Sequence, residues 1–154
     1  MRVSNGKLIL CYSKYMKIDI LLAELDKLNL PKDQYAITSS GILAIRGIRE
    51  ANDLDIIVSP KLWEELSKKY PIKKEGFESI ETGNIQILWK GSFFTDSEIA
   101  TIEEQIDTAD IIQGYRFVNL NLIKKFKKIG GREKDKKDLR LIKSYENKKL
   151  QAKH

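Results

Sequence analysis

Apolar residues alternate with polar ones in patterns that predict helices and short strands along the first half of the chain. A helix is predicted over Lys14–Leu30, because its apolar residues share one helical face and Pro31 ends it. Short apolar runs predict strands at Tyr35–Thr38 and Leu54–Val58, and the second is dense in branched residues. A short helix, Ile42–Ile48, is predicted between them, so a strand, helix and strand follow one another here.

Small and polar residues mark the boundaries of these elements. Ser39, Ser40 and Gly41 form a small-residue turn after the first strand. Ser59 followed by Pro60 is typical of a helix start, with serine as the N-cap and proline in the first turn. The sequence therefore predicts a helix from this point to about residue 69.

The second half of the chain predicts two more strands and then mainly helices. The strands are Phe77–Ile80 and Ile85–Trp89, with a hairpin turn at residues 81–84. Thr95 and Glu98 match a capping box that opens a helix. Residues 109–118 are ambiguous and include a short strand pair about Gly114 as one interpretation.

The C-terminal part is predicted to form two basic helices. Asn119 is positioned to cap a helix through Lys128, and the glycines at 130 and 131 interrupt it before a last helix over about 132–149. The whole pattern predicts a single α/β (α+β) domain over residues 1–154. Its small mixed sheet has about four to five strands flanked by helices, and residues 119–154 form a helical C-terminal part.

Composition and missing residue types narrow the chemistry. The chain is 42% hydrophobic and 32% charged, lacks an apolar run of membrane-spanning length and begins without a signal-like apolar segment. These features favour a cytoplasmic protein without a membrane partner. Cys11 is the only cysteine, which argues against an internal disulfide or a zinc site built on thiolates. His154 is the only histidine, so histidine-based catalysis and imidazole-bound zinc are excluded.

Charge is unevenly distributed along the sequence. Residues 1–115 carry 14 Lys and Arg against 18 Asp and Glu, a balance of −4, whereas residues 116–154 carry 14 against 4, a balance of +10. This asymmetry favours an anionic partner such as nucleic acid, a nucleotide or an acidic protein. The alternative is a basic helical surface that faces solvent.

Two carboxylates interrupt the apolar run of the second strand. Asp53 and Asp55 are two residues apart, so they project from the same side of an extended chain. Convergent carboxylates of this kind suit Mg²⁺, which takes few protein oxygens and leaves positions for phosphate. The alternative is an exposed strand start whose carboxylates pair with Arg46 or Arg49.

The order of these motifs resembles the DNA polymerase β-type nucleotidyltransferase superfamily. Its signature is a Gly-Gly or Gly-Ser turn, a gap of about nine to thirteen residues, and an acid, a hydrophobic residue and an acid. Here twelve residues separate Ser40 from the Asp53-Leu54-Asp55 run. The C-terminal Gly-Arg-Glu-Lys-Asp-x-x-Asp run, residues 131–138, is similar to the segment that closes many small members.

The resemblance implies roles for specific residues. Asp53 and Asp55 would be catalytic and would bind Mg²⁺, with a nucleoside triphosphate as substrate. The nucleotide would be bound by the turn, by two arginines and by a lysine of the C-terminal run, namely Ser39, Ser40, Gly41, Arg46, Arg49 and Lys134. The alternative for the arginines and Lys134 is ordinary ion pairing.

Two positions depart from the family pattern. Ser39 stands where the family has glycine. Gln86 stands where the third carboxylate is expected, while Glu81 falls in the predicted turn. Without a third acid, the base that would deprotonate an attacking hydroxyl is missing.

These sequence features are consistent with three functions. The first is Mg²⁺-dependent transfer of a nucleoside monophosphate from a nucleoside triphosphate to a hydroxyl acceptor. The second is a non-catalytic module of the same fold that binds nucleotide or nucleic acid through its basic C-terminal half. The third is one half of a toxin–antitoxin-like pair. Phe93 and Phe94 are expected either to pack the last helices or to contact a second copy or partner protein.

Overall fold

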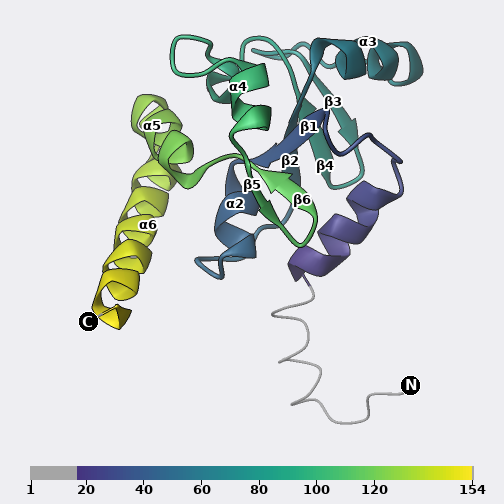
Figure 1. The fold of residues 1–154 in the computed structure, drawn as a ribbon. Coiled ribbons are helices and arrows are strands. Elements are labelled where there is room, and N and C mark those ends of the chain that lie inside the picture. Colours follow the sequence, from purple (N-terminus) through teal and green to yellow (C-terminus); the bar gives the residue numbers. More distant parts are fainter. Residues whose placement is uncertain (1–16, 154) are drawn as a thin grey trace, which may run out of the picture.

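The computed structural model describes residues 17–153 and contains one mixed six-stranded sheet with helices around it (Figure 1). A first helix covers residues 17–26. Cys11, the predicted start of this helix at Lys14 and His154 lie outside the described residues. The other elements, in chain order, are β1 (Tyr35–Thr38), α2 (Ser40–Ile45), β2 (Leu54–Val58), α3 (Pro60–Lys69), β3 (Ser79–Thr82), β4 (Ile85–Leu88), the 3₁₀ helix η1 (Phe93–Thr95), α4 (Ile102–Asp107), β5 (Asp110–Ile112), β6 (Tyr115–Phe117), α5 (Leu120–Gly130) and α6 (Glu133–Ala152).

The strand order across the sheet is β3-β4-β2-β1-β6-β5. Strand β2 is antiparallel to β1 and parallel to β4, and β1 is parallel to β6. The α+β class is therefore confirmed, with six strands rather than four to five. The two extra strands are β5 and β6, which form the pair about Gly114 that the sequence left ambiguous.

The central strands are apolar because both faces of the sheet are covered. Ile37, Leu54 and Ile56 are completely buried, as are Ile57 and Val58. Helix α2 packs directly on one face, where a Cβ added to Gly41 would lie 3.0 Å from Leu54 Cδ2 and even closer to Ile37 Cγ2. Gly41 is therefore required for this close packing, independently of any ligand.

Polar contacts attach the first helix to the sheet. Glu24 accepts hydrogen bonds from the backbone N–H and the side chain of Asn84 in the β3–β4 turn, at 2.7 and 3.0 Å. Tyr115 of β6 donates to Asp26 at 2.6 Å. These contacts join the helix to strands on both sides of the acidic strand β2.

Several helix starts follow the predicted capping chemistry. Ser59 accepts from Leu62 N at 3.2 Å at the start of α3, and Asn119 accepts from Asn121 N at 2.8 Å before α5. The capping box predicted at Thr95 is wrong. It is formed instead by Thr101 and Glu104 at the start of α4.

Helices α5 and α6 form a hairpin beside the sheet, and α6 extends away from it towards the C-terminus (Figure 1). Phe94 is buried and its ring lies 6.0 Å from that of Phe126. The Arg132 guanidinium lies 4.8 Å from the Phe93 ring. The two phenylalanines therefore pack against the last helices, which is one of their two expected roles. Among residues 17–153, no helix combines the length and apolarity needed to cross a membrane.

Candidate active site

Asp53 and Asp55 lie where the polar α2–β2 loop enters the sheet. Asp53 is exposed in the loop, and Asp55 is half-buried as the second residue of β2. The two are separated by the fully buried Leu54, so their side chains project to the side opposite the core-facing leucine. The two carboxylates are close enough for the charge of Asp53 to act on the pKa of Asp55.

The strand register puts a row of polar side chains on the face that carries Asp55. Thr38 of β1 and Gln86 of β4 are the direct neighbours of Asp55, and Glu81 of β3 is the neighbour of Gln86. Paired residues on adjacent strands project to the same face. The prediction that Glu81 lies in the hairpin turn is therefore wrong, because β3 continues to Thr82 and the turn is formed by Gly83 and Asn84.

The Asp55 carboxyl is in an environment that disfavours its charge. Burial raises its pKa to about 6, and the neighbouring negative charge of Asp53 adds to the rise. Lys134, the Ser39 hydroxyl and Lys127 act in the opposite direction without cancelling it. Asp55 therefore lacks a full countercharge from the protein. Its neighbour Thr38 is completely buried, and the Thr38 Oγ1 atom has no hydrogen-bond partner within the described part of the chain.

The turn between β1 and α2 lies beside this carboxylate. Ser39 has φ 57° and ψ −130°, a backbone conformation that glycine adopts easily and residues with a side chain rarely adopt. Ser40 begins α2 and is half-buried, and Gly41 follows it in the packed first turn.

The two arginines of the α2–β2 connection point to different places. Arg49 makes a two-pronged contact with Asp138 of α6, at 2.6 and 2.8 Å, and lies close enough to Asp53 for their charges to interact. Arg46 instead contacts Asp110 of β5 at 2.9 Å. Neither forms an ion pair with Asp53 or Asp55, so the alternative interpretation of these arginines is wrong for the acidic pair. Arg49 belongs to the surroundings of the acidic pair, and Arg46 does not.

The C-terminal run combines a structural and an exposed part. Asp135 and Asp138 are buried, and Lys134 is exposed and lies near enough to Asp55 to lower its pKa. Burial alone would raise the pKa of Asp138, but hydrogen bonds from Arg49 and Lys127 hold that pKa below its usual range. Asp138 therefore stays charged and connects α6 to the loop before Asp53.

Lys127 is a central residue of this charge cluster that the sequence did not identify. Its ammonium is almost completely buried, 2.9 Å from Asp138 and 3.8 Å from Asp135. A signal was present, because Lys127 falls four residues after the buried Ile123, on the apolar side of α5. A lysine at such a position requires buried acidic partners.

Comparison with known proteins adds no family assignment. No family model, curated protein or solved structure matched the chain. Within residues 17–153, no three His, Cys, Asp or Glu side chains are grouped closely enough to form a metal site by themselves. The fold and the site thus define an α+β protein with two convergent carboxylates, one undercompensated in charge, beside a strained serine turn.

Proposed function

We propose that the protein is a Mg²⁺-dependent nucleotidyltransferase that transfers a nucleoside monophosphate from a nucleoside triphosphate to a hydroxyl acceptor. The observation that carries this proposal is the half-buried Asp55 carboxylate, whose pKa is raised to about 6 beside Asp53. A carboxylate pair held in this state has a negative charge that a cation would stabilise. The adjoining turn and the exposed Lys134 add groups that suit phosphate.

The available oxygen donors fit Mg²⁺. This ion commonly binds one or two protein carboxylates and completes its shell with water and phosphate oxygens, so a third carboxylate is not needed to hold it. Asp53 and Asp55 would provide the protein ligands. The chemistry supplied by bound Mg²⁺ is neutralisation of charge on the triphosphate and the leaving pyrophosphate.

The reaction forms a bond between the acceptor oxygen and the α-phosphorus and breaks the bond from that phosphorus to pyrophosphate. Backbone N–H groups of the Ser39–Gly41 turn and the Lys134 ammonium would hold the phosphates in line. The acceptor hydroxyl must lose its proton, which Gln86 cannot accept. Glu81, the residue beyond Gln86 in the polar row, is the nearest carboxylate along that row for this task.

A second candidate is a nucleotide- or nucleic-acid-binding module without turnover. The specific observation in its favour is Gln86, which is directly paired with Asp55 at the position where a third carboxylate would act. Glu81 is two strands from Asp55, roughly 10 Å between backbones, and contacts Lys73 at 3.3 Å. Where the second candidate binds nucleotide, it shares the prediction of Mg²⁺-dependent triphosphate binding with the first, and only the first predicts pyrophosphate release.

Calorimetric titration with each of the four ribonucleoside triphosphates, with MgCl₂ or with EDTA, tests the shared prediction. We expect binding of at least one triphosphate that requires Mg²⁺. The double variant Asp53→Asn and Asp55→Asn should weaken it by about 10- to 100-fold, because each carboxylate lost is a charged ligand. Pyrophosphate release with small alcohol and RNA acceptors then distinguishes catalysis from binding alone.

A matched control removes two carboxylates that lie elsewhere. Asp33 and Asp107 are exposed, so the double variant Asp33→Asn and Asp107→Asn makes the same change in net charge away from the site. Its triphosphate affinity should stay within about twofold of the original protein. Equal losses in both double variants, or no Mg²⁺-dependent binding at all, would contradict the proposal.

A further inference from the structure

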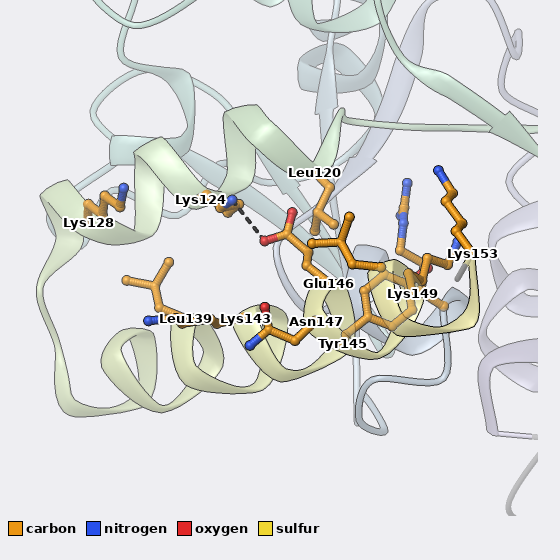
Figure 2. Close-up of a pocket in the computed structure, with 12 residues that line it drawn as sticks. Leu120, Lys124, Lys128, Leu139, Lys143, Tyr145, Glu146, Asn147, Lys149 and Lys153 are labelled. Atoms are coloured by element: carbon orange, nitrogen blue, oxygen red, sulfur yellow. Dashed lines mark hydrogen bonds and ion pairs between the residues drawn. The ribbon is translucent and has the colours of Figure 1, made fainter.

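A groove of about 820 Å³ lies between α5 and α6, on the C-terminal hairpin. One wall is a stripe of α5 residues spaced four apart, Leu120, Lys124 and Lys128. The other wall is α6 from Leu139 to the end of the helix (Figure 2). Neither Asp53 nor Asp55 lines this groove, so it is separate from the candidate active site.

The groove is strongly basic. Its lining includes five lysines and Arg46, against Glu146 as the one acidic residue. Glu146 already contacts Lys124 at 2.9 Å, as the dashed line in Figure 2 shows, and Arg46 already contacts Asp110. Within residues 17–153, the remaining cations form no ion pair: Lys128, Lys143, Lys149 and Lys153.

The same groove has an apolar side. Leu120 and Leu139 line it from opposite helices, and Tyr145 and Leu150 continue the apolar surface along α6. Leu150 is 58% exposed, so its side chain adds accessible apolar surface at this end of the groove. The Lys149 ammonium lies 5.1 Å from the Tyr145 ring, so a cation and an aromatic face occur together.

The lysines of the groove suit a ligand with repeating anionic groups, and the Tyr145 ring suits a ligand with flat apolar faces. Lys143 lies in α6, and Lys153, ten residues later, directly follows its last residue, so the basic wall extends over about 15 Å. Single-stranded nucleic acid presents phosphates at regular intervals and unpaired bases that stack on aromatic rings. An acidic peptide supplies the charge without the flat faces, and a duplex hides its bases within the stack.

We infer that the α5–α6 groove binds single-stranded nucleic acid, with phosphates on the free lysines and a base against Tyr145. This inference does not depend on the proposed nucleotidyl transfer. Binding should persist in the double variant Asp53→Asn and Asp55→Asn, so failure of one proposal is distinguishable from failure of the other.

Fluorescence anisotropy of labelled single strands of about ten nucleotides tests the inference, with RNA and DNA of the same sequence measured in parallel. The triple variant Lys128→Gln, Lys143→Gln and Lys149→Gln should lose at least about tenfold in affinity near physiological salt. The slope of log K against log salt should become shallower by about 2, since each phosphate contact on a single strand contributes about 0.7. The RNA and DNA measurements show whether the sugar is discriminated.

The chain offers a matched control on the same two helices. Lys125, Lys137 and Lys148 are exposed and do not line the groove, so changing all three to glutamine gives the same net charge. This control should retain affinity within about threefold, because nonspecific attraction alone is lost. Tyr145→Leu keeps an apolar side chain and removes the ring, and it should weaken binding by about fivefold or more.

Three results would overturn the inference. The first is an equal loss of affinity in the groove triple variant and the control triple variant. The second is a duplex or a poly-glutamate peptide that competes as well as the single strand. The third is full retention of affinity in the groove triple variant when its circular dichroism spectrum shows an intact fold.

Discussion

Ser39 and Asp55 are the two residues of the candidate site whose conformation or burial is energetically unfavourable. The Ser39 backbone has φ 57° with a side chain attached, a conformation that costs roughly 1–3 kcal/mol. Asp55 is half-buried with a raised pKa, and the Ser39 hydroxyl is one of the groups that moderates the rise. The strained residue therefore supports the carboxylate whose charge is least compensated.

Replacing Asp55 with asparagine should stabilise the protein at high pH. The folded pKa of about 6 lies above the usual value of 3.8, so folding favours the neutral carboxyl. The original protein therefore loses stability as pH rises from about 4 through 6, and Asp55→Asn does not. We expect the variant to gain on the order of 3 kcal/mol at pH 8 and almost nothing at pH 4. Urea unfolding across this pH range, without Mg²⁺, measures the difference.

Asp33→Asn is the control for this experiment, because Asp33 is an exposed carboxylate in a turn. Its effect on the free energy of unfolding should remain below about 0.5 kcal/mol at every pH. A stability difference between Asp55→Asn and the original protein that does not change between pH 4 and pH 8 would contradict the raised pKa.

At the scale of elements, a buried charge cluster fixes the C-terminal hairpin to the loop that carries the acidic pair. Lys127 of α5 contacts Asp138 of α6, and Asp138 also accepts two hydrogen bonds from Arg49. Buried charges are costly unless every partner is present. The cluster therefore specifies how α5, α6 and the α2–β2 loop meet, and a change at one member leaves the others uncompensated.

Asp138→Ala should lower the free energy of unfolding by about 3–5 kcal/mol near pH 7, since Lys127 would remain buried without its nearest partner. The lowered folded pKa of Asp138 means that its contribution is present at neutral pH. That contribution is lost as pH falls below about 4 towards the folded pKa. Urea unfolding at pH 7 and pH 3 measures both effects.

The exposed pair Glu133 and Lys136 at the start of α6 provides the comparison. Lys136→Ala should change stability by less than about 0.5 kcal/mol at either pH. A loss below 1 kcal/mol for Asp138→Ala would show that the cluster contributes little, contrary to its burial.

Patterns of apolar residues predicted the central elements well and the peripheral ones less well. Strands β1 and β2 have the predicted bounds, because each is a short, largely apolar run of four or five residues between turn signals. The predicted Thr95 cap is absent because the Thr95 hydroxyl lies 2.8 Å from both Trp89 O and Ser92 O, where it donates its one proton. Thr101 carries the same motif six residues later. Local spacing does not decide between two such motifs.

The candidate site was predicted in part for a similar reason. Asp53 and Asp55 stood out because carboxylates interrupt an apolar run. Their polar neighbours depend on strand register, which pairs Glu81 with Gln86 and Gln86 with Asp55. Lys127 and Asp138 are close only because two helices pack against each other, and no spacing along the chain encodes that contact.

At the scale of the whole molecule, the helix α6 in the basic C-terminal segment 116–154 has a part that packs against the protein and an end that is exposed to solvent. Asp135, Asp138 and Ile142 are the buried residues of this helix. Residues 147–153 are all exposed and include Lys149, Leu150 and Lys153 of the groove. The buried residues through which α6 stabilises the fold therefore lie in its first half, whereas the groove of the proposed nucleic-acid site continues to its exposed end.

Ending the chain after Glu146 should separate the stability of the fold from the binding of single-stranded nucleic acid. The removed segment buries no side chain among residues 147–153, and Glu146 keeps its contact with Lys124, so the melting temperature should fall by less than about 3 °C. Affinity for single-stranded RNA should fall by at least about tenfold, because two of the four unpaired groove lysines and Leu150 are removed. Mg²⁺-dependent triphosphate binding, measured by calorimetry on the same shortened protein, should be unchanged, since the acidic pair and Lys134 remain. A large drop in melting temperature would mean that the end of α6 supports the fold, and unchanged RNA affinity would show that the nucleic acid binds elsewhere.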